Sequence, residues 1–508
     1  MTVKEALASW KGKAVKAAME EEIHSLISMG TWELVERPPG VNIMKNQWML
    51  TTKYHIDDTV EREKARLVVN GFMQMYGANY EETYAPVSSY VMLRIFLSIV
   101  AVLDLNLMQL DMKNAFLQSK LDWMLYMNQP EYFNDGTGRV CKLLKSLYGP
   151  KKSPFFLYRA LDGVLLGAGW KKSQVDPALY FKVGDDKLRE ISPVQKYLRL
   201  EIVRDRSVRK LWLHQQGYVD KLRRRFLDVE QNGRTRKTPV LVVAYATLTS
   251  DDKEAQLRQE EEFRQKVGSL RFAAATTRPD IAFTCSKLGS GLTVRSDQHW
   301  RKVDCCLAYL ANIRDTALEF GGGAQSQSFE RSRRFKKSLK LVGYVDADDA
   351  GDKQNRMSMG GYVFVFGGAS VSWSSQRIKC ATVSSTESEY VAATDASKEG
   401  RRLLFLLAEF RQLDAGTPTV LRVDNKSAIT VAEGMGLTGK LKHMERQQAW
   451  LQHMVKRGKF SLRYIPTAEQ PADFLTKALH YPAFNRCFVA IGQVCLVNMG
   501  DGDNNVQQ

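Results

Sequence analysis

Four acidic residues in the C-terminal part of the chain have the type and placement that a metal site requires. Each sits at the end of an element expected from the sequence pattern: Asp346, Glu387, Asp424 and Asp473. Mg²⁺ prefers oxygen ligands, and no set of histidines and cysteines here competes for another metal. Two such ions about 4 Å apart activate a water and stabilise the leaving oxygen when a phosphodiester is cleaved. We therefore expect the acids to bind two Mg²⁺ ions, for which Mn²⁺ can substitute.

Three of these acids also have a purely structural explanation. Asp346 could close a turn, and Asp424 and Asp473 could each accept hydrogen bonds from unpaired backbone N–H groups at a helix start. Taken singly, each residue is explained better by structure than by chemistry. Only the combination of acids on several elements points to a metal site.

The fourth acid lies in a run with more than one capping pattern. Glu387 could close a capping box with Ser384. Thr386 can pair in the same way with Glu389, which leaves Glu387 free. We therefore expect Glu387 to reach the metals and Glu389 to serve only as a capping residue on a different side of the helix.

The elements that must position these acids alternate between strand and helix patterns. Three strands are expected first, and then helices and strands in turn, with bounds 341–345, 361–366, 370–374, 387–413, 420–423, 426–434, 442–455, 460–464 and 472–479. Such an order predicts an α/β layer domain over residues 341–482. Asp346 would follow its first strand, and Asp424 would lie at a strand-to-helix junction.

The charge balance of the whole chain favours a polyanionic partner. Its 508 residues contain 73 Lys and Arg against 56 Asp and Glu, a net charge of +17. Nucleic acid is the usual partner of such a surface, although a merely solvated basic surface has the same composition. The basic residues cluster at Lys221, Arg223, Arg224, Arg225, Arg234, Arg236 and Lys237, and again at Arg331, Arg333, Arg334, Lys336, Lys337 and Lys340.

Composition also excludes several classes of protein. With 44% hydrophobic and 25% charged residues, the chain is neither disordered nor collagen-like. Seven cysteines without a Cys-x-x-Cys pair argue against a disulfide scaffold or a zinc module. No secretory signal or membrane-length apolar run is visible, so we expect no membrane partner and an intracellular location, cytoplasmic, nuclear or both.

Several blocks carry a resemblance to a known family. Residues 344–348, 384–390, 424–425, 442–443 and 472–477 resemble, in this order, the ribonuclease H domain of copia-type retrotransposon polyproteins. The resemblance implies that Asp346, Glu387, Asp424 and Asp473 are that domain's catalytic, metal-binding acids. Residues 356–360, Arg-Met-Ser-Met-Gly, depart from the family's Ser/Thr-rich segment, which affects a turn and not a ligand.

The resemblance continues upstream. Residues 64–68, 82–87, 109–117, 147–149 and 277–281 are similar to copia-type reverse transcriptase. The family implies a fingers–palm–thumb polymerase. On this resemblance Arg66 binds the incoming triphosphate, Asp111 is the first metal-binding acid, and Phe116 contacts the sugar as a steric gate.

The polymerase chemistry needs further acids, and the family supplies them from a Tyr-Val-Asp-Asp hairpin. The only Tyr-Val-Asp strings here are residues 218–220, followed by Lys, and residues 344–346 in the ribonuclease H region. The interval between residues 181 and 197, where the family has the hairpin, is too short. Asp185 and Asp186 follow Gly184, but the polar run at 187–190 favours a surface turn. The simplest explanation for the missing Tyr-Val-Asp-Asp hairpin is an internal deletion between residues 181 and 197.

These observations predict an α+β and α/β multidomain chain with a truncated fingers–palm–thumb region before a ribonuclease H-like α/β domain. The expected segments are an N-terminal helical linker (1–30), a truncated fingers and palm region (31–206), a helical thumb-like region (207–320), a basic linker (321–340), the ribonuclease H-like domain (341–482) and a C-terminal tail (483–508).

The family's function is RNA-directed DNA synthesis and cleavage of RNA in RNA–DNA hybrids. We expect only the cleavage to survive, with an RNA–DNA hybrid or other nucleic acid as partner and no cofactor beyond metal. A second hypothesis is a catalytically dead remnant that only binds nucleic acid. A third is a working polymerase that takes its missing acids from elsewhere, such as Asp185 and Asp186.

Overall fold

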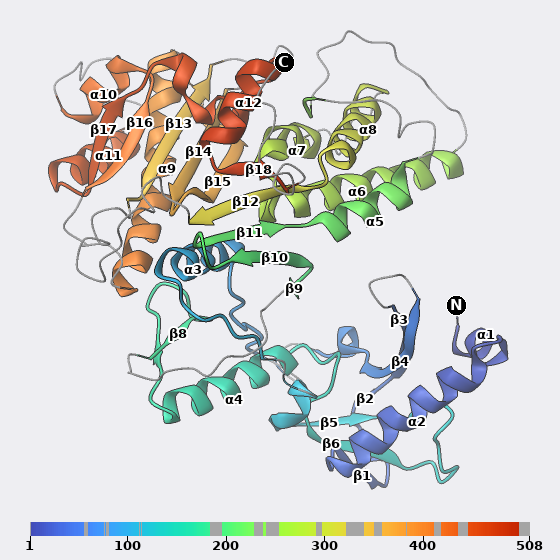
Figure 1. Cartoon of the computed structure of the whole chain (residues 1–508). Coiled ribbons are helices and arrows are strands. Elements are labelled where there is room, and N and C mark those ends of the chain that lie inside the picture. Colours follow the sequence, from blue (N-terminus) through green and yellow to red (C-terminus); the bar gives the residue numbers. More distant parts are fainter. Residues whose placement is uncertain are drawn as a thin grey trace. The chain divides into compact units, whose positions relative to one another are not determined.

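A computed structural model of the chain describes residues 2–54, 59–75, 77, 81–110, 112, 114–182, 196–227, 237–239, 253–290, 297–321, 340–349, 358–380, 382, 384–410, 418–434 and 445–496. The chain divides into two compact units, Met1–Ser88 with Leu110–Asp185, and Ser89–Gln109 with Asp186–Gln508. Both contain helices and sheets, which confirms the expected mixed fold class (Figure 1). No helix in the described ranges combines the length and hydrophobicity needed to cross a membrane.

The first unit begins with two helices, α1 (Val3–Ala8) and α2 (Gly12–Ser28). Side chains that recur every three or four residues on α2 are buried: Val15, Met19, Ile23 and Leu26. This spacing places them on one helical face, which packs into a hydrophobic core shared with the strands that follow. Residues 1–30 were expected to form a helical linker. They are helical, but α2 belongs to the core of the first unit.

Two small sheets complete the first unit. One has the order β1-β6-β5-β2, and the other is the antiparallel hairpin of β3 and β4. Their bounds are β1 Trp32–Val35, β2 Ile43–Met44, β3 Asn46–Tyr54, β4 Val60–Val69, β5 Lys120–Met127 and β6 Val140–Lys145. Helix α4 (Ser153–Gly167) and the short pair of β7 (Lys171–Lys172) and β8 (Tyr180–Phe181) follow.

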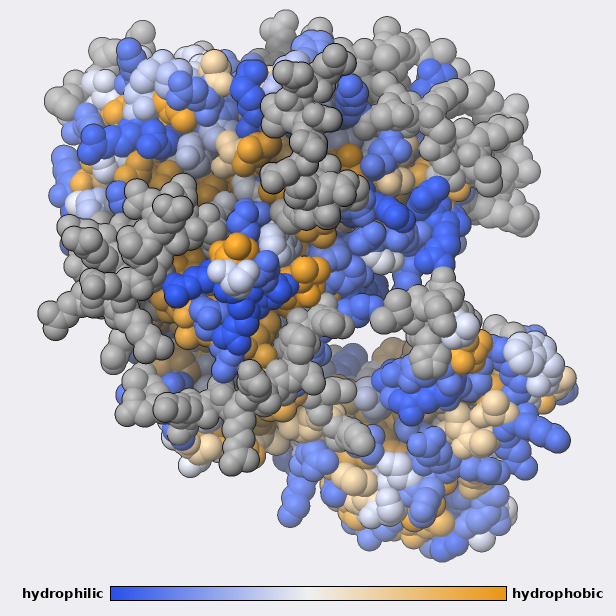
Figure 2. Space-filling model, viewed as in Figure 1, coloured by the Kyte–Doolittle hydropathy of each residue, from blue (hydrophilic) through white to orange (hydrophobic). Residues whose placement is uncertain are grey.

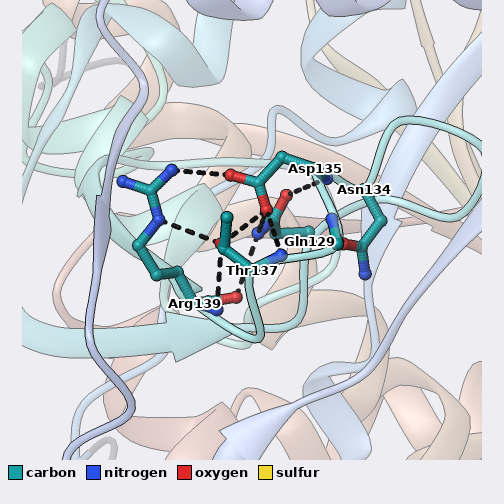
Figure 3. A network of polar contacts seen from close by, with 6 residues as sticks. Gln129, Asn134, Asp135, Thr137 and Arg139 are labelled. Carbon is teal, nitrogen blue, oxygen red and sulfur yellow. Dashed lines mark hydrogen bonds and ion pairs between the residues drawn. The ribbon is translucent and has the colours of Figure 1, made fainter.

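A polar network closes the loop that joins β5 to β6 (Figure 3). The Asp135 carboxylate accepts hydrogen bonds from the Thr137 hydroxyl at 2.6 Å, from Gln129 Nε2 at 2.6 Å and from Arg139 Nη2 at 2.7 Å. The hydrogen bonds from Thr137 and Gln129 hold the pKa of Asp135 well below its usual range. The loop is therefore built around an ionised carboxylate.

The second unit contains a five-stranded sheet of order β18-β12-β11-β10-β9. Its strands are β9 Lys196–Tyr197, β10 Leu200–Asp205, β11 Lys210–His214, β12 Thr316–Gly321 and β18 Gln493–Cys495. The helices between them are α5 Gln216–Phe226, α6 Lys253–Thr276, α7 Ala282–Ser290 and α8 Asp297–Asn312. Most of the expected thumb-like region is helical, but β11 and β12 bring it into a sheet with the C-terminal strand.

Helix α3 (Tyr90–Leu103) belongs to this second unit, although the sequence placed it in the fingers and palm region. Its Arg94 is 2% exposed and donates hydrogen bonds to the carbonyl oxygens of Val371, Ala275 and Thr276, at 2.7–2.9 Å. The guanidinium also lies 3.9 Å from the ring centroid of Trp373. This buried arginine joins α3 to segments 181 to 277 residues away in the chain.

A second five-stranded sheet, of order β15-β14-β13-β16-β17, holds the candidate site. Its strands are β13 Val342–Asp348, β14 Met359–Phe366, β15 Ala369–Arg377, β16 Thr419–Val423 and β17 Phe460–Tyr464. The first three are antiparallel, whereas β16 runs parallel to β13, and β17 runs parallel to β16. Three antiparallel strands extended by two parallel ones, with helices between them, form the ribonuclease H-like arrangement expected from the sequence.

The two faces of this sheet are covered by different segments. A Cβ added to Gly360 would meet Ala392 of α9 (Ser385–Glu409), whereas one added to Gly361 would lie 2.7 Å from Leu475. Because successive residues of a strand point to opposite faces, α9 and the 3-10 helix η8 (Pro471–Leu475) cover opposite sides. The absence of a side chain at Gly361 allows η8 to approach the strand closely.

The C-terminal part differs from the sequence-based expectation. The expected helix at 472–479 is the short η8 instead, and a full helix, α12 (Tyr481–Ala490), follows it. Residues 493–495 form β18 and pair with β12. Much of the expected tail is therefore ordered structure. Helices α10 (Lys426–Ala432) and α11 (Glu445–Lys456) match the expected helices in position and order.

Candidate functional site

Three carboxylates meet at one edge of the five-stranded sheet that contains β13 and β16. Oxygen atoms of Asp346, Glu389 and Asp424 all lie within 4.8 Å of one another. Strands β13 and β16 are adjacent and parallel, with Val345 opposite Val423 in the register. The residues that follow these two positions therefore lie side by side, which brings Asp346 next to Asp424. Helix α9 adds the third carboxylate from its first turns.

The third member of this cluster is Glu389 and not the expected Glu387. Ser384 is the N-cap of α9 and its side chain accepts a hydrogen bond from the backbone N–H of Glu387. Glu387 thus occupies the capping position that the sequence analysis had given to Glu389. Two residues along a helix turn the side chain by about 200°, so Glu389 faces the sheet edge. Its Oε1 accepts a hydrogen bond from the Ala347 N–H at 3.0 Å.

The fourth expected acid, Asp473, lies beside the cluster on η8. Its Oδ1 is 3.2 Å from the ammonium of Lys477, which is also 3.6 Å from Asp346 Oδ2. The Thr476 hydroxyl donates a hydrogen bond to the same Asp346 oxygen. Gln470 Nε2 donates to the Val345 carbonyl at 2.8 Å, which holds the start of this segment against β13.

Burial and neighbouring negative charges disfavour the ionised forms of Asp346, Glu389 and Asp473. Burial, together with the charges of Asp346 and Asp424, raises the pKa of Glu389 to about 9. Burial and the charge of Asp346 raise the pKa of Asp473 to about 7. Burial also raises the pKa of Asp346, although Lys477 opposes this shift. A cluster with these properties is stabilised by protons or by bound cations.

The donor set fits a hard divalent cation. Glu389 Oε2 is buried and has no hydrogen-bond partner among the described residues. A buried carboxylate oxygen without a donor is costly unless a cation satisfies it. Three carboxylates and no nitrogen or sulfur ligand are the type of site that Mg²⁺ or Mn²⁺ prefers. Among the described residues, Asp473 does not belong to the group of carboxylates that lie within 4.8 Å of one another.

Two of the three expected polymerase residues, Arg66 and Phe116, lie in the first unit. The Arg66 guanidinium is 5.1 Å from the ring centroid of Tyr148, and the Phe116 ring meets the same tyrosine edge-on at 4.8 Å. Tyr148 therefore joins these two residues, a role that sequence reasoning did not assign to it. Gly149 follows with φ +110°, and a Cβ there would lie 1.8 Å from the Val69 carbonyl oxygen. Asp111 lies outside the described residues.

The strands that should flank the catalytic hairpin do not pair with each other. β8 pairs with β7 in the first unit, whereas β9 pairs with β10 in the second. Residues 183–195, including Asp185 and Asp186, lie outside the described residues.

Comparison with known proteins agrees with these features. Residues 29–189 match the family described as Reverse transcriptase (RNA-dependent DNA polymerase). The chain is 33% identical over 531 residues to the Retrovirus-related Pol polyprotein from transposon TNT 1-94 of Nicotiana tabacum, covering 97% of this chain and 39% of the relative. Over almost all of its length, the chain is therefore similar to part of a Pol polyprotein of copia-type retrotransposons.

Other relatives and solved structures extend this comparison. The Pol polyprotein from transposon RE1 of Arabidopsis thaliana is 31% identical, over 96% of this chain and 34% of the relative. The chain thus spans between one third and two fifths of the length of these Pol polyproteins. RNase H1 from Halobacterium salinarum is 22% identical over 27% of this chain and 94% of its own, with a TM-score of 0.21. LC11-RNase H1, solved in complex with an RNA/DNA hybrid, is 19% identical over 27% of this chain and 94% of its own, with a TM-score of 0.22.

Proposed function

We propose that this retrotransposon-derived chain cleaves the RNA strand of RNA–DNA hybrids at Asp346, Glu389 and Asp424, and that its polymerase half is inactive. The observation that carries the proposal is the convergence of these three carboxylates at one sheet edge. The net charge of +17 suits a polyanionic substrate. Relationship to Pol polyproteins supports the choice of a hybrid over other nucleic acids.

In this proposal the protein holds the cation and fixes the carboxylates. Asp346, Glu389 and Asp424 are the ligands, and the Ala347 N–H orients Glu389. The Thr467 hydroxyl donates to Asp424 Oδ2 at 2.8 Å, which fixes that carboxylate in turn. A bound divalent cation would supply an activated water and stabilise the charge that develops on the scissile phosphate.

Cleavage of a labelled RNA–DNA hybrid by the full chain tests the proposal. We expect cuts in the RNA strand when Mg²⁺ or Mn²⁺ is present and none in excess EDTA. Duplex DNA of the same sequence, with the same metal, is the matched control and should stay intact. Binding of the hybrid without any cleavage would favour the alternative of a dead remnant.

We expect no templated DNA synthesis. The Tyr-Val-Asp-Asp sequence is absent from the interval between residues 181 and 197, and β8 and β9 belong to different sheets. Two-metal phosphoryl transfer requires more than one acid, so Asp111 alone cannot support it. Primer extension on an RNA template measures templated DNA synthesis. The wild-type signal should equal that of an Asp111→Asn variant, and any excess over the variant would contradict the prediction.

Nucleic-acid binding should depend strongly on salt and little on sequence, because contacts to phosphates release counterions and read no bases. Arg223, Arg224 and Arg225 are exposed in the last turn of α5, where the visible surface over α5 and α6 is hydrophilic (Figure 2). Residues 228–236 and 331–339 of the two basic clusters lie outside the described residues.

Replacing all three of these arginines by glutamine should weaken binding and lower the slope of log K against log salt by about 2–3. Fluorescence anisotropy at a series of salt concentrations measures both quantities. A variant with the wild-type slope, or a wild-type affinity that does not change with salt, would show that this basic surface is only solvated.

A further inference from the structure

A cation of the protein itself lies among the acids of the candidate site. The Lys477 ammonium is 3.2 Å from Asp473 Oδ1 and 3.6 Å from Asp346 Oδ2. Its side chain is 32% exposed, whereas those of Asp346 and Asp473 are 2% and 12% exposed. The lysine therefore reaches in from the surface and places its charge between two largely buried carboxylates.

This arrangement divides the four acids into two sets. Asp346, Glu389 and Asp424 lie close enough together to share one cation. Asp473 is linked to Asp346 through Lys477, and the Asp346 oxygen on that side also accepts from Thr476. A second Mg²⁺ ion held by both Asp346 and Asp473 would need oxygen ligands at about 2.0–2.1 Å. It would have to displace the ammonium, because two cations cannot share that space.

We infer that Lys477 is a built-in counter-ion on the Asp346–Asp473 side of the site, and that the chain free of nucleic acid therefore binds one divalent cation instead of two. The inference rests on the proposed function, since it takes the three-carboxylate group as the metal site. Lys477 is a positioning residue in this account, and its effect is measured on metal binding rather than on cleavage.

Mn²⁺ titration of the full chain, followed by electron paramagnetic resonance, tests the inference. The wild type should bind one Mn²⁺ tightly. Lys477→Gln removes a positive charge that lies within a few Å of the ligands, so this variant should bind the first ion about tenfold more tightly and should take up a second. Lys477→Arg, which keeps the charge, should behave as the wild type.

The matched control is Lys398→Gln, which makes the same change of charge in the same unit. Lys398 lies on α9, is 52% exposed at its side chain and pairs with Asp395 at 2.8 Å, not with the acids of the site. It should bind Mn²⁺ as the wild type does. Equal stoichiometry and affinity in the wild type and in Lys477→Gln would overturn the inference.

Two further comparisons keep the test decisive. If Lys477→Gln does not fold, Asp473→Asn is compared with Asp473→Asn/Lys477→Gln, in which the loss of one charge of each sign leaves the site balanced. The double variant should bind Mn²⁺ about tenfold more tightly than Asp473→Asn, and equal affinities would refute the inference.

If the wild type binds no Mn²⁺, the proposed function fails. Unfolding in EDTA then still tests the counter-ion, since Lys477→Gln should unfold at a lower temperature than Lys398→Gln, and equal temperatures would refute it.

Discussion

Replacing Glu389 by glutamine is expected to reduce Mg²⁺-dependent cleavage of an RNA–DNA hybrid by at least about 100-fold, because metal-ion catalysis is worth several kcal/mol of transition-state stabilisation. Glutamine keeps the shape of the side chain and can still accept the hydrogen bond from Ala347. It removes one of the three negative charges that would hold the cation. The fold should survive, since the variant relieves repulsion with Asp346 and Asp424.

Glu387→Gln is the matched control for this prediction. It makes the same substitution in the same helix, two residues away, and both glutamates are almost fully buried, at 2% and 4% exposure. Glu387 lies outside the three-carboxylate group, so its variant should retain cleavage within about threefold of the wild type. Initial rates on a labelled hybrid measure both variants. Equal losses in the two would contradict the assignment of Glu389.

The metal-free chain should become less stable as the pH rises from about 5 to about 9. Burial and neighbouring charges raise the pKa of Glu389 from 4.5 to about 9 and that of Asp473 from 3.8 to about 7. Between the unfolded and folded pKa values, the folded state binds more protons than the unfolded state, so the free energy of unfolding falls with increasing pH. The expected loss is at least about 2 kcal/mol, because a shift of one pKa unit corresponds to about 1.4 kcal/mol.

Thermal unfolding at several pH values, in EDTA and in excess Mg²⁺, measures this effect. A cation that binds only the folded state at a concentration about 100 times its dissociation constant adds about 2.7 kcal/mol, so Mg²⁺ should cancel most of the loss at high pH. Glu389→Gln should show a weaker pH dependence in EDTA. An unfolding temperature in EDTA that is constant or rises across this range would contradict the account of the cluster.

The strand pattern was sufficient to predict where Asp346 and Asp424 lie. Asp346 lies near the C-terminal end of β13 and Asp424 follows β16, and parallel neighbours present their C-terminal ends at the same edge of a sheet. The same pattern led to Glu387, whereas the structure places Glu389 in the cluster. Ser384 and Thr386 are both good N-caps, and moving the helix start by two residues exchanges the faces of the two glutamates. The Ser384–Glu387 spacing was the signal that pointed to the observed cap.

Other features depend on contacts between distant parts of the chain. The apolar sequence of α3 predicts a buried helix but not its partners, which Arg94 selects through carbonyl groups on α6 and β15. The charge of Lys477 was visible in the sequence, but its position between Asp346 and Asp473 follows from the close approach of η8 to β14 at Gly361. A one-dimensional pattern does not contain these distances.

Anomalous scattering from crystals of the full chain soaked in Mn²⁺ would locate a bound ion directly. We predict an ion within about 2.5 Å of carboxylate oxygens from Asp346, Glu389 and Asp424. The Lys477 ammonium should remain between Asp346 and Asp473 in the absence of nucleic acid. An ion held by Glu387 in place of Glu389, or no ion at this sheet edge in saturating Mn²⁺, would contradict the account.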